Sequence, residues 1–247
     1  MSTHIQREKY LKSGYFEIEN FFSDDQFEQI KIFVDQKIKE NNNKSFFLTS
    51  NTNSEIDFFF KKNFTINQKI ETVIKQFSFV KIDENNHETY KCLRVLKKSR
   101  IKKQSRDFHF DSHLLTILVP IYIPNREGSE NGHLMMSPKL RAETKNIFKN
   151  VFQKLFYQNR ILSQLTKYAW FRKKINLEKI ILKPKSIFIF NGFTNLHGNL
   201  EIFEEDTRAT LLIHAYDLFK NSKLVNFNRN MRIFLEKRNI KKNKNYG

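Results

Sequence analysis

Two short segments place histidine side chains where they could bind a metal ion. Within residues 107–112, the alternation of a β-strand puts His109 and Asp111 on one face, about 7 Å apart at Cα. His197 follows a turn signal and is flanked by glycine, which permits a close approach of the backbone. Two histidines and one carboxylate form the facial triad that suits non-heme Fe(II) and leaves three coordination positions open. The pattern therefore predicts these three residues as metal ligands, against the alternative of a hydrogen-bonded polar pair at a strand end.

An arginine and a threonine further along the chain form a second polar pair. In segment 207–214, a period of two places Arg208 and Thr210 on one face and apolar residues on the other. The guanidinium group donates two parallel hydrogen bonds to a carboxylate, and the threonine hydroxyl donates a third. An Fe(II) triad needs an electron-supplying acid such as 2-oxoglutarate. A carboxylate-binding pair in the same chain as the triad is therefore what such a site would require. A surface salt bridge is the alternative for Arg208 alone.

The elements that position these residues begin with a well-marked helix. Ser23 and Gln26 form a capping box, and apolar residues recur at helical spacing from Phe27 to Ile38. Before this helix we expect a short strand, and after it a second amphipathic helix. These two elements are placed at 14–21 and 67–79, whereas the apolar residues of 45–67 follow no clear period.

The rest of the chain is typical of a β-rich core with one helical interruption. Short apolar runs separated by turn signals predict strands over 90–96, 108–110, 114–123, 132–137, 180–182, 186–190 and 208–216. Between the fourth and fifth strands, apolar residues at helical spacing predict one long helix or two shorter ones, with basic residues on the opposite face. This pattern indicates a β-sandwich or barrel with a helical insertion at about 139–174.

The order and spacing of these motifs resembles the Fe(II)/2-oxoglutarate-dependent dioxygenases, whose core is a double-stranded β-helix or jelly roll. The His-x-Asp…His…Arg pattern of that superfamily matches His109, Asp111, His197 and Arg208 in order. The resemblance implies a mainly β fold with a cupin-like jelly-roll core, N-terminal helices that flank it, and the helical insertion.

Two further segments look most like the phytanoyl-CoA-hydroxylase-like branch of this superfamily. One is the opening 14–24, which leads into the capped helix. The other is 182–190, which is similar to the strand before the distal histidine of that branch. Lys185-Ser186 stands where the branch usually has Gly-Asp after the Lys-Pro turn. This departure weakens the match of the turn and leaves the ligands untouched.

The resemblance also implies an activity and its cofactors. Fe(II), 2-oxoglutarate and O₂ would take part, with oxidative decarboxylation of 2-oxoglutarate to succinate coupled to hydroxylation of a C–H bond. Arg208 and Thr210 would bind the far carboxylate of 2-oxoglutarate. The expected substrate is a small metabolite or a carrier-bound acyl or aminoacyl group. The alternatives are a protein or peptidyl hydroxylase of the same superfamily, and a basic nucleic-acid-binding β-barrel protein without catalysis.

The net charge of +18 is unevenly distributed along the chain. Six bases lie in 97–106, ten bases and one acid in 139–174, and seven bases and one acid in 229–244, so the remainder has a net charge of −3. A uniform compositional bias would spread lysine more evenly. The charge therefore predicts an anionic substrate or partner, with nucleic acid as the less favoured partner.

The first basic segment ends close to the predicted metal ligands. Lys102, Lys103 and Arg106 are accordingly expected to contact an anionic substrate near the mouth of the site. His113 shares the strand face of the ligands and is expected to contact the substrate rather than the metal ion.

Length and composition set the remaining limits. The 247 residues fit one domain, which we place at 1–228, followed by a basic C-terminal tail over 229–247. The single cysteine excludes a disulfide framework and any multi-cysteine metal site, as a reducing compartment allows. Without an apolar run long enough for a membrane span or a signal peptide, a cytoplasmic location is expected.

Overall fold

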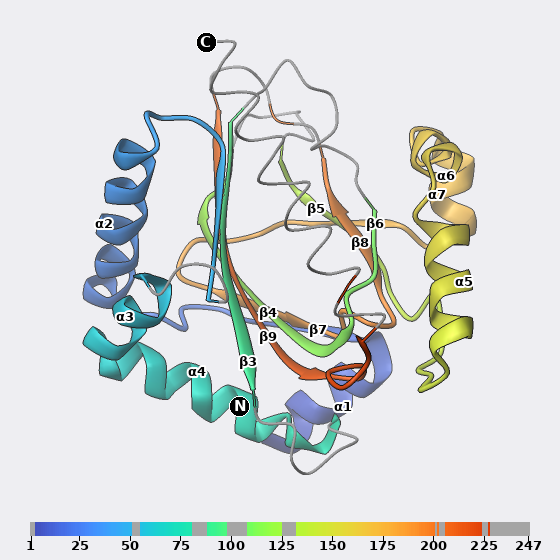
Figure 1. Ribbon diagram of the computed structural model, residues 1–247, viewed down its shortest axis with the longest axis horizontal. Helices are drawn as coiled ribbons and strands as arrows, with labels where there is room; N and C mark the ends of the chain where they lie inside the picture. The colour runs from blue at the N-terminus through green and yellow to red at the C-terminus, as the bar shows by residue number, and fades with distance from the viewer. Residues whose placement is uncertain are drawn as a thin grey trace.

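The chain folds into two β-sheets with helices on both outer sides (Figure 1). The computed structural model describes residues 3–50, 55–80, 88–97, 108–124, 132–200, 202, 206–223 and 227. In chain order the elements are α1 (Thr3–Ser13), β1 (Tyr15–Ile18), α2 (Asp24–Glu40), β2 (Phe46–Thr49), α3 (Glu55–Lys62), α4 (Phe64–Gln76), the 3₁₀ helix η1 (Ser78–Val80), β3 (Thr89–Lys97), β4 (His113–Tyr122), β5 (Leu134–Ser137), α5 (Ile147–Tyr157), α6 (Arg160–Leu165), α7 (Ala169–Lys174), β6 (Glu178–Ile180), β7 (Ile187–Phe190), β8 (Leu196–Asn199) and β9 (Thr207–Asp217). This is the predicted mainly β fold with a double-stranded β-helix core.

The larger sheet has six antiparallel strands in the order β1-β7-β4-β9-β3-β2. Strand β9 lies between β3 and β4, and its register with β3 runs from Thr89 opposite Ala215 to Lys97 opposite Thr207. Alternation along β9 buries Leu211 and its apolar neighbours against the helices, while Arg208 and Thr210 face the interior between the sheets. The predicted division of this strand into two faces is confirmed.

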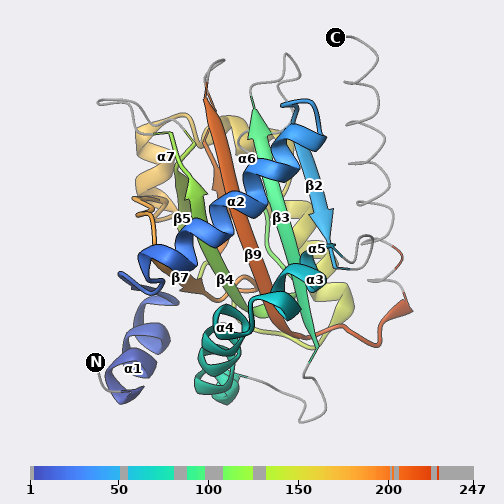
Figure 2. The same cartoon turned by 90° about the vertical axis from the view of Figure 1, so that its left-hand side faces the viewer.

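Helices α2, α3 and α4 cover the outer face of the larger sheet (Figure 2). Helix α2 begins after Ser23, whose hydroxyl accepts a hydrogen bond from the amide of Gln26, and the Gln26 side chain accepts one from the amide of Ser23. This reciprocal pair is the predicted capping box. The buried face of α2 packs against the core as its helical spacing requires, with Ile30 and Val34 at its centre.

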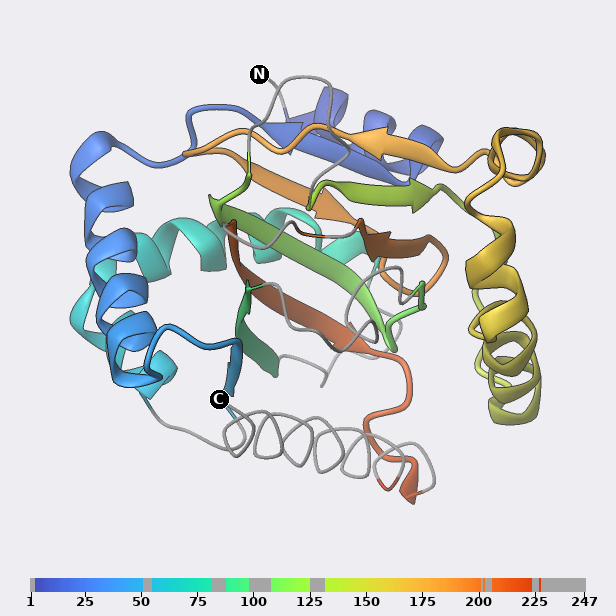
Figure 3. The ribbon, with the colours of Figure 1, turned by 90° about the horizontal axis from the view of Figure 1, so that it is seen from above.

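The smaller sheet consists of β6-β5-β8, and helices α5–α7 lie beside it, on the side of the molecule away from α2 (Figure 3). An isolated antiparallel bridge between His109 and His197 adds the segment before β4 to the edge of β8. The predicted strand over 108–110 is therefore reduced to this single bridge. In the part of the chain that the structure describes, no helix is long and apolar enough to span a membrane.

Three elements differ from the sequence-based expectation at the N-terminal side. Helix α1 was not predicted, because its sequence is polar. Among residues 7–13, whose side chains the structure describes, Tyr10 is deeply buried, and its hydroxyl donates a hydrogen bond to the carbonyl of Leu114 on β4 (2.8 Å). The ambiguous region 45–67 divides into β2, α3 and the first residues of α4. The predicted helix over 67–79 starts earlier, at Phe64, and ends at Gln76.

Two further differences concern the segment that contains His197 and the helical insertion. His197 follows strand β7 and the turn over 191–195, as expected, but it lies in a further strand, β8, which is too short and too polar to show a period of two. The insertion forms three short helices rather than one or two. Several apolar residues of α5, such as Phe148 and Phe152, are exposed. Trp170 of α7 is exposed as well.

Candidate active site

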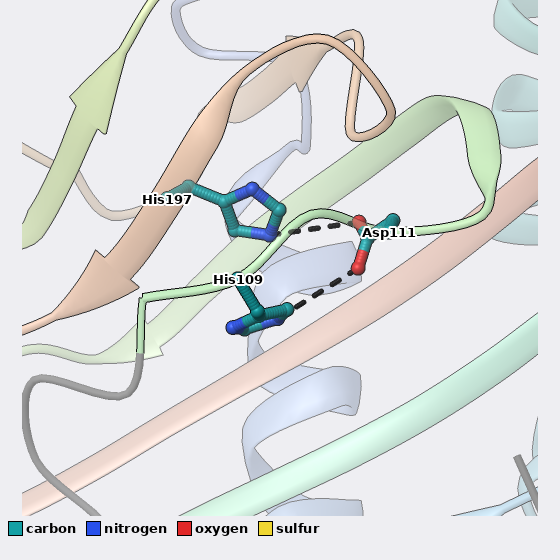
Figure 4. A group of neighbouring side chains, drawn as sticks. All are labelled: His109, Asp111 and His197. Carbon is teal, nitrogen blue, oxygen red and sulfur yellow. Dashed lines mark ion pairs between the residues drawn. The ribbon is translucent and has the colours of Figure 1, made fainter. Parts of the chain in front are cut away.

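His109, Asp111 and His197 meet at one end of the interior between the two sheets (Figure 4). One donor atom from each side chain lies within 4.8 Å of the other two. Nε2 of His109 is 3.7 Å from Oδ1 of Asp111, and Nε2 of His197 is 3.6 Å from Oδ2 of the same carboxylate. Among the described residues this is the group of histidine and carboxylate side chains that could hold a metal ion, and it consists of the three predicted ligands.

The backbone fixes the two histidines relative to each other. The amide of His109 donates to the carbonyl of His197 (2.9 Å), and the amide of His197 donates back to the carbonyl of His109 (3.0 Å). Residues paired in this way place their side chains on the same side of the sheet. The ring centroids are accordingly 4.5 Å apart. A residue pair separated by 88 positions in the sequence is thus brought together by two main-chain hydrogen bonds.

Hydrogen bonding also determines which nitrogen of His197 faces the site. Nδ1 of His197 lies 2.9 Å from the carbonyl oxygen of Asn195. A carbonyl oxygen can only accept, so Nδ1 carries the proton and the lone pair is on Nε2. Asn195 is itself fully buried, and its side chain is hydrogen-bonded at both ends. The side-chain NH₂ group donates to the carbonyl of Gly14 (2.8 Å), and the side-chain oxygen accepts from the backbone amide of Lys139 (2.9 Å). His197 is therefore held by surrounding hydrogen bonds of the kind that orient metal-binding histidines.

Asp111 is held by the turn that precedes β8. Its amide donates to the carbonyl of Gly192 (2.8 Å), and its Oδ2 accepts a hydrogen bond from the hydroxyl of Thr116 (2.9 Å). The Thr116 hydroxyl is also 3.0 Å from Nδ1 of His214. A side chain at position 192 would overlap the Asp111 carboxylate and lie 2.6 Å from the Thr116 hydroxyl oxygen. Only glycine leaves room for the carboxylate here.

The charge state of Asp111 suits a cation. Burial favours its protonated form, but His197, His214 and His109 surround it, and their attraction holds the pKa of the carboxyl well below its usual range. The site therefore presents a carboxylate with imidazole rings around it. His214, on strand β9, is also hydrogen-bonded to the hydroxyl of Thr116.

The anion receptor lies in the same interior, on strand β9. Arg208 is deeply buried, with Nε donating to the carbonyl of Gly132 (2.7 Å) and NH1 donating to the hydroxyl of Thr210 (3.3 Å). Burial, and to a smaller extent the charge of Arg94, lower the pKa of Arg208 to about 9, so the guanidinium remains protonated at neutral pH. A buried cation with one hydroxyl neighbour is a site for a carboxylate.

Arg94 is a candidate binding residue that the sequence analysis missed. It lies on β3 directly opposite Thr210, and its side chain lines the cavity together with those of Arg208 and Phe47. Its position follows from the alternation of β3, because Tyr90 and Arg94 share the inward face. The alternation within the predicted strand over 90–96 already placed Arg94 on one face. Only the pairing with β9 shows that this face points towards Arg208 and Thr210.

The triad and the receptor open into one cavity of about 400 Å³. Its lining includes the metal-binding group, the residues of the receptor, the ring of Phe190 and a wall from helix α5. His113 also lines it, with its ring stacked on Tyr90 and 5.0 Å from that of His214. The predicted substrate-contacting histidine is therefore placed in the cavity. Lys102, Lys103 and Arg106 lie outside the described residues.

The buried Arg141 contacts both helix α5 of the helical insertion and the segments that contain the candidate metal ligands. The guanidinium of Arg141 lies 4.1 Å from the ring centre of Phe110 and 3.8 Å from that of Phe193. Its Nε donates to the carbonyl of Phe193 (2.6 Å), and NH1 donates to the side chain of Asn150 on α5 (2.9 Å). Burial lowers the pKa of Arg141 to about 9, while the charge of Asp111 opposes that shift. Phe110 stands between two of the ligands, so this contact supports their positions.

Comparison with known proteins finds likeness in structure but not in sequence. No family model matches the sequence, and no curated protein matches it. Among solved structures, EctD from S. alaskensis with bound Fe has a TM-score of 0.58 at 14% identity, covering 87% of this chain and 77% of that one. The same protein with 2-oxoglutarate and 5-hydroxyectoine gives a TM-score of 0.56 at 13% identity, covering 87% of this chain and 76% of that one.

Two other similar structures are enzymes of different activity. SnoK, a non-heme alpha ketoglutarate dependent carbocyclase from nogalamycin biosynthesis, has a TM-score of 0.54 at 11% identity, covering 88% of this chain and 84% of that one. A prolyl 4-hydroxylase from Phytophthora capsici has a TM-score of 0.53 at 13% identity, covering 90% of this chain and 64% of that one. The phytanoyl-CoA-hydroxylase-like branch stays a prediction. What the similarity establishes is the fold, and this chain has the double-stranded β-helix fold of these iron-dependent and 2-oxoglutarate-dependent oxygenases.

Proposed function

We propose that the protein is a non-heme Fe(II)- and 2-oxoglutarate-dependent oxygenase that hydroxylates a small substrate. The observation that carries this proposal is the convergence of His109, Asp111 and His197, within 4.8 Å of one another, on a cavity that also holds Arg208. The structural likeness to EctD and SnoK supports it, because those proteins have this fold and are described with iron or alpha-ketoglutarate.

The residues present fit an iron ion. Two imidazole nitrogens and one carboxylate oxygen are the donor set of the facial triad, which prefers Fe(II) over ions that take only oxygen ligands. The lone pair of His197 is directed by its hydrogen bond to Asn195, and Asp111 is ionised. When bound there, Fe(II) would supply the redox chemistry that couples O₂ to the oxidation of 2-oxoglutarate and of a substrate C–H bond.

The chain itself would bind and orient the cosubstrate. We assign the far carboxylate of 2-oxoglutarate to Arg208 and Thr210, whose hydrogen bond of 3.3 Å already brings the two donors together. Arg94, opposite Thr210, adds a second positive charge on the same side of the cavity. A dicarboxylate that spans from these residues to the triad would be held at both ends, which is what a reaction at a fixed C–H bond requires.

The cavity favours a small substrate over a long peptide. Its volume of about 400 Å³ lies in the usual range for small-molecule sites. Helix α5 forms one of its walls through Val151 and Lys154. The ring of Phe190 lies against His197 with 4.9 Å between ring centres, which gives the metal side of the cavity an apolar surface. A metabolite or the end of a carrier-bound acyl or aminoacyl group matches this shape. Hydroxylation is the reaction we assign.

The test is a titration of the purified protein with Fe(II) and 2-oxoglutarate in the absence of O₂, followed by visible absorption. A charge-transfer band that needs both components is expected. On admission of air, the protein should release succinate from 2-oxoglutarate, and release should rise when the correct substrate is added from pools of metabolites.

Matched variants separate the triad from other histidines. His109→Ala should lose both the absorption band and succinate release, whereas His133→Gln, which lies outside the cavity lining, should retain both. A His109→Ala protein with full turnover would remove the triad from the proposal. Failure of the wild-type protein to bind Fe(II) at all would remove the proposal itself.

A further inference from the structure

Helix α5 carries large apolar side chains on its outward side. Phe148, Phe152, Leu155 and Phe156 are 83%, 70%, 71% and 56% exposed. Their spacing of four, seven and eight residues from the first places them along one face of the helix. We call these four residues the α5 stripe. Single exposed apolar residues are common on proteins, but a row of four on one helix marks an interaction site.

The surroundings of the α5 stripe are strongly basic. Residues 144–177, which contain helices α5, α6 and α7, hold eight bases and no acid. Lys145, Lys149, Lys167 and Lys173 are exposed, and within the described ranges none of them has a carboxylate partner. The helices on the other side of the molecule, α2 and α3, mix acids with bases instead (Figure 1). The positive charge is therefore concentrated where the apolar stripe is.

We propose that the α5 stripe docks on an anionic lipid surface. A helix with an apolar face bordered by lysines lies in the interface of a bilayer, with its apolar side chains among the acyl chains. Each lysine near such a surface adds electrostatic attraction to anionic headgroups. Ile161 on α6 and Trp170 on α7, 73% and 60% exposed, provide further side chains of the kind found at membrane interfaces.

Charge argues against a symmetric dimer as the occupant, and the types of the exposed side chains argue against nucleic acid. A symmetric dimer through this surface would bring one basic segment against its own copy, because the two halves of a two-fold interface are identical. Single-stranded nucleic acid would neutralise the lysines, but it binds by stacking bases on aromatic rings. Leu155 and Ile161 have no ring to offer, whereas acyl chains bury aliphatic and aromatic side chains equally well.

Docking would also orient the enzyme. Leu155 belongs both to the α5 stripe and to the lining of the cavity, and its neighbours Val151 and Lys154 line the cavity too. A lipid surface in contact with the stripe would therefore lie next to the wall of the candidate active site. This placement concerns the surface alone and holds whether or not the site uses iron.

The experiment measures binding of the full chain to sedimenting vesicles of phosphatidylcholine alone or with 30% phosphatidylserine. We expect binding to the anionic vesicles and little to the neutral ones. Replacing Phe148 and Phe152 together by serine should lower the partition coefficient at least about 20-fold, because two aromatic side chains no longer enter the bilayer. Lys145→Glu with Lys149→Glu should lower it by a similar factor, from about five-fold for each lysine lost.

Controls come from the other side of the molecule. Phe58→Ser on α3 removes an equally exposed phenylalanine, and Lys61→Glu with Lys62→Glu reverses two exposed charges there. Both control proteins should bind within about two-fold of wild type, and circular dichroism should show all variants folded.

The proposal is overturned if wild-type protein fails to bind anionic vesicles, or if the α5 variants bind them as well as wild type does. It is also overturned if light scattering shows a wild-type dimer that the α5 variants dissociate, or if a single-stranded oligonucleotide binds through the same four residues. Because no step requires metal or turnover, failure here leaves the proposed oxygenase function standing, and failure of the oxygenase test leaves docking standing.

Discussion

Gly192 gives the Asp111 carboxylate its space. The carbonyl of Gly192 accepts the amide hydrogen of Asp111, and the Cα of Gly192 faces the carboxylate so closely that a methyl group there would overlap Oδ2. The same methyl group would lie 2.6 Å from the hydroxyl oxygen of Thr116, which holds that carboxylate oxygen. The turn before β8 thus shapes the metal-binding group without contributing a side chain to it.

The first prediction follows from this contact. Gly192→Ala should displace Asp111 and lower Fe(II) affinity by about 10-fold to 100-fold, the usual range for disturbed outer-shell partners. Titration with Fe(II), read by the absorption band with 2-oxoglutarate, measures the change. Thermal unfolding of the metal-free protein checks that the variant is folded. An unchanged Fe(II) affinity in a folded Gly192→Ala protein would show that Asp111 is not a ligand.

A second prediction concerns the anion receptor. Arg208→Gln should raise the KM for 2-oxoglutarate by about 10-fold to 100-fold, because a charge-assisted hydrogen bond to a carboxylate contributes about 1.5–3 kcal/mol. Arg94→Gln should raise it less, since Arg94 lies on the neighbouring strand. Steady-state kinetics of succinate release give both values. Equal KM values for wild type and Arg208→Gln would assign the cosubstrate carboxylate elsewhere.

The third prediction addresses the outer shell of His197. Asn195→Ala should remove two hydrogen bonds, one to the carbonyl of Gly14 and one from the amide of Lys139, while the Gly14 carbonyl keeps its bond from the amide of Asn191. An ordinary hydrogen bond contributes about 0.5–1.5 kcal/mol net, so the free energy of unfolding should fall by about 1–3 kcal/mol. Urea denaturation measures it. A fall below 1 kcal/mol would indicate that water replaces the amide, and the buried position argues against this.

The fourth prediction is a control on the scaffold. Ser23→Ala removes the exposed capping hydroxyl of α2 and should lower the free energy of unfolding by about 1 kcal/mol. The cap lies on the outer helical layer, so the KM for 2-oxoglutarate and Fe(II) affinity should stay at their wild-type values. Chemical denaturation and the same titrations provide the comparison. A change in metal affinity would mean that α2 transmits its position to the site.

Motifs with a local physical cause were predictable from the sequence. The capping box at Ser23 satisfies its own hydrogen bonds within four residues, so the start of α2 needed no tertiary information. The two faces of β9 follow from alternation alone, which is why Arg208 and Thr210 were assigned to one side. The three candidate ligands were recognised from residue types that suit iron, in an order that resembles a known superfamily.

Features that depend on distant partners were not predictable in this way. Strand β8 is too short to show a period, and it exists because His197 pairs with His109 and its neighbours pair with β5. Helix α1 has a polar sequence, and Tyr10 is buried by distant partners, namely the rings of Phe77 and Phe79 and the carbonyl of Leu114.

The sequence by itself determined the chemistry that is available: two imidazoles, a carboxylate and a guanidinium on strands whose faces alternate. Tertiary structure alone decided that these groups meet. Backbone pairing across 88 residues sets His109 beside His197, and the absence of a side chain at Gly192 admits Asp111 between them. Tertiary structure also decided that Phe148 and Phe152 of α5 are exposed, because a helical period marks an apolar face without specifying whether that face meets the core. Local patterns specify which face of an element is polar, and packing specifies what that face meets.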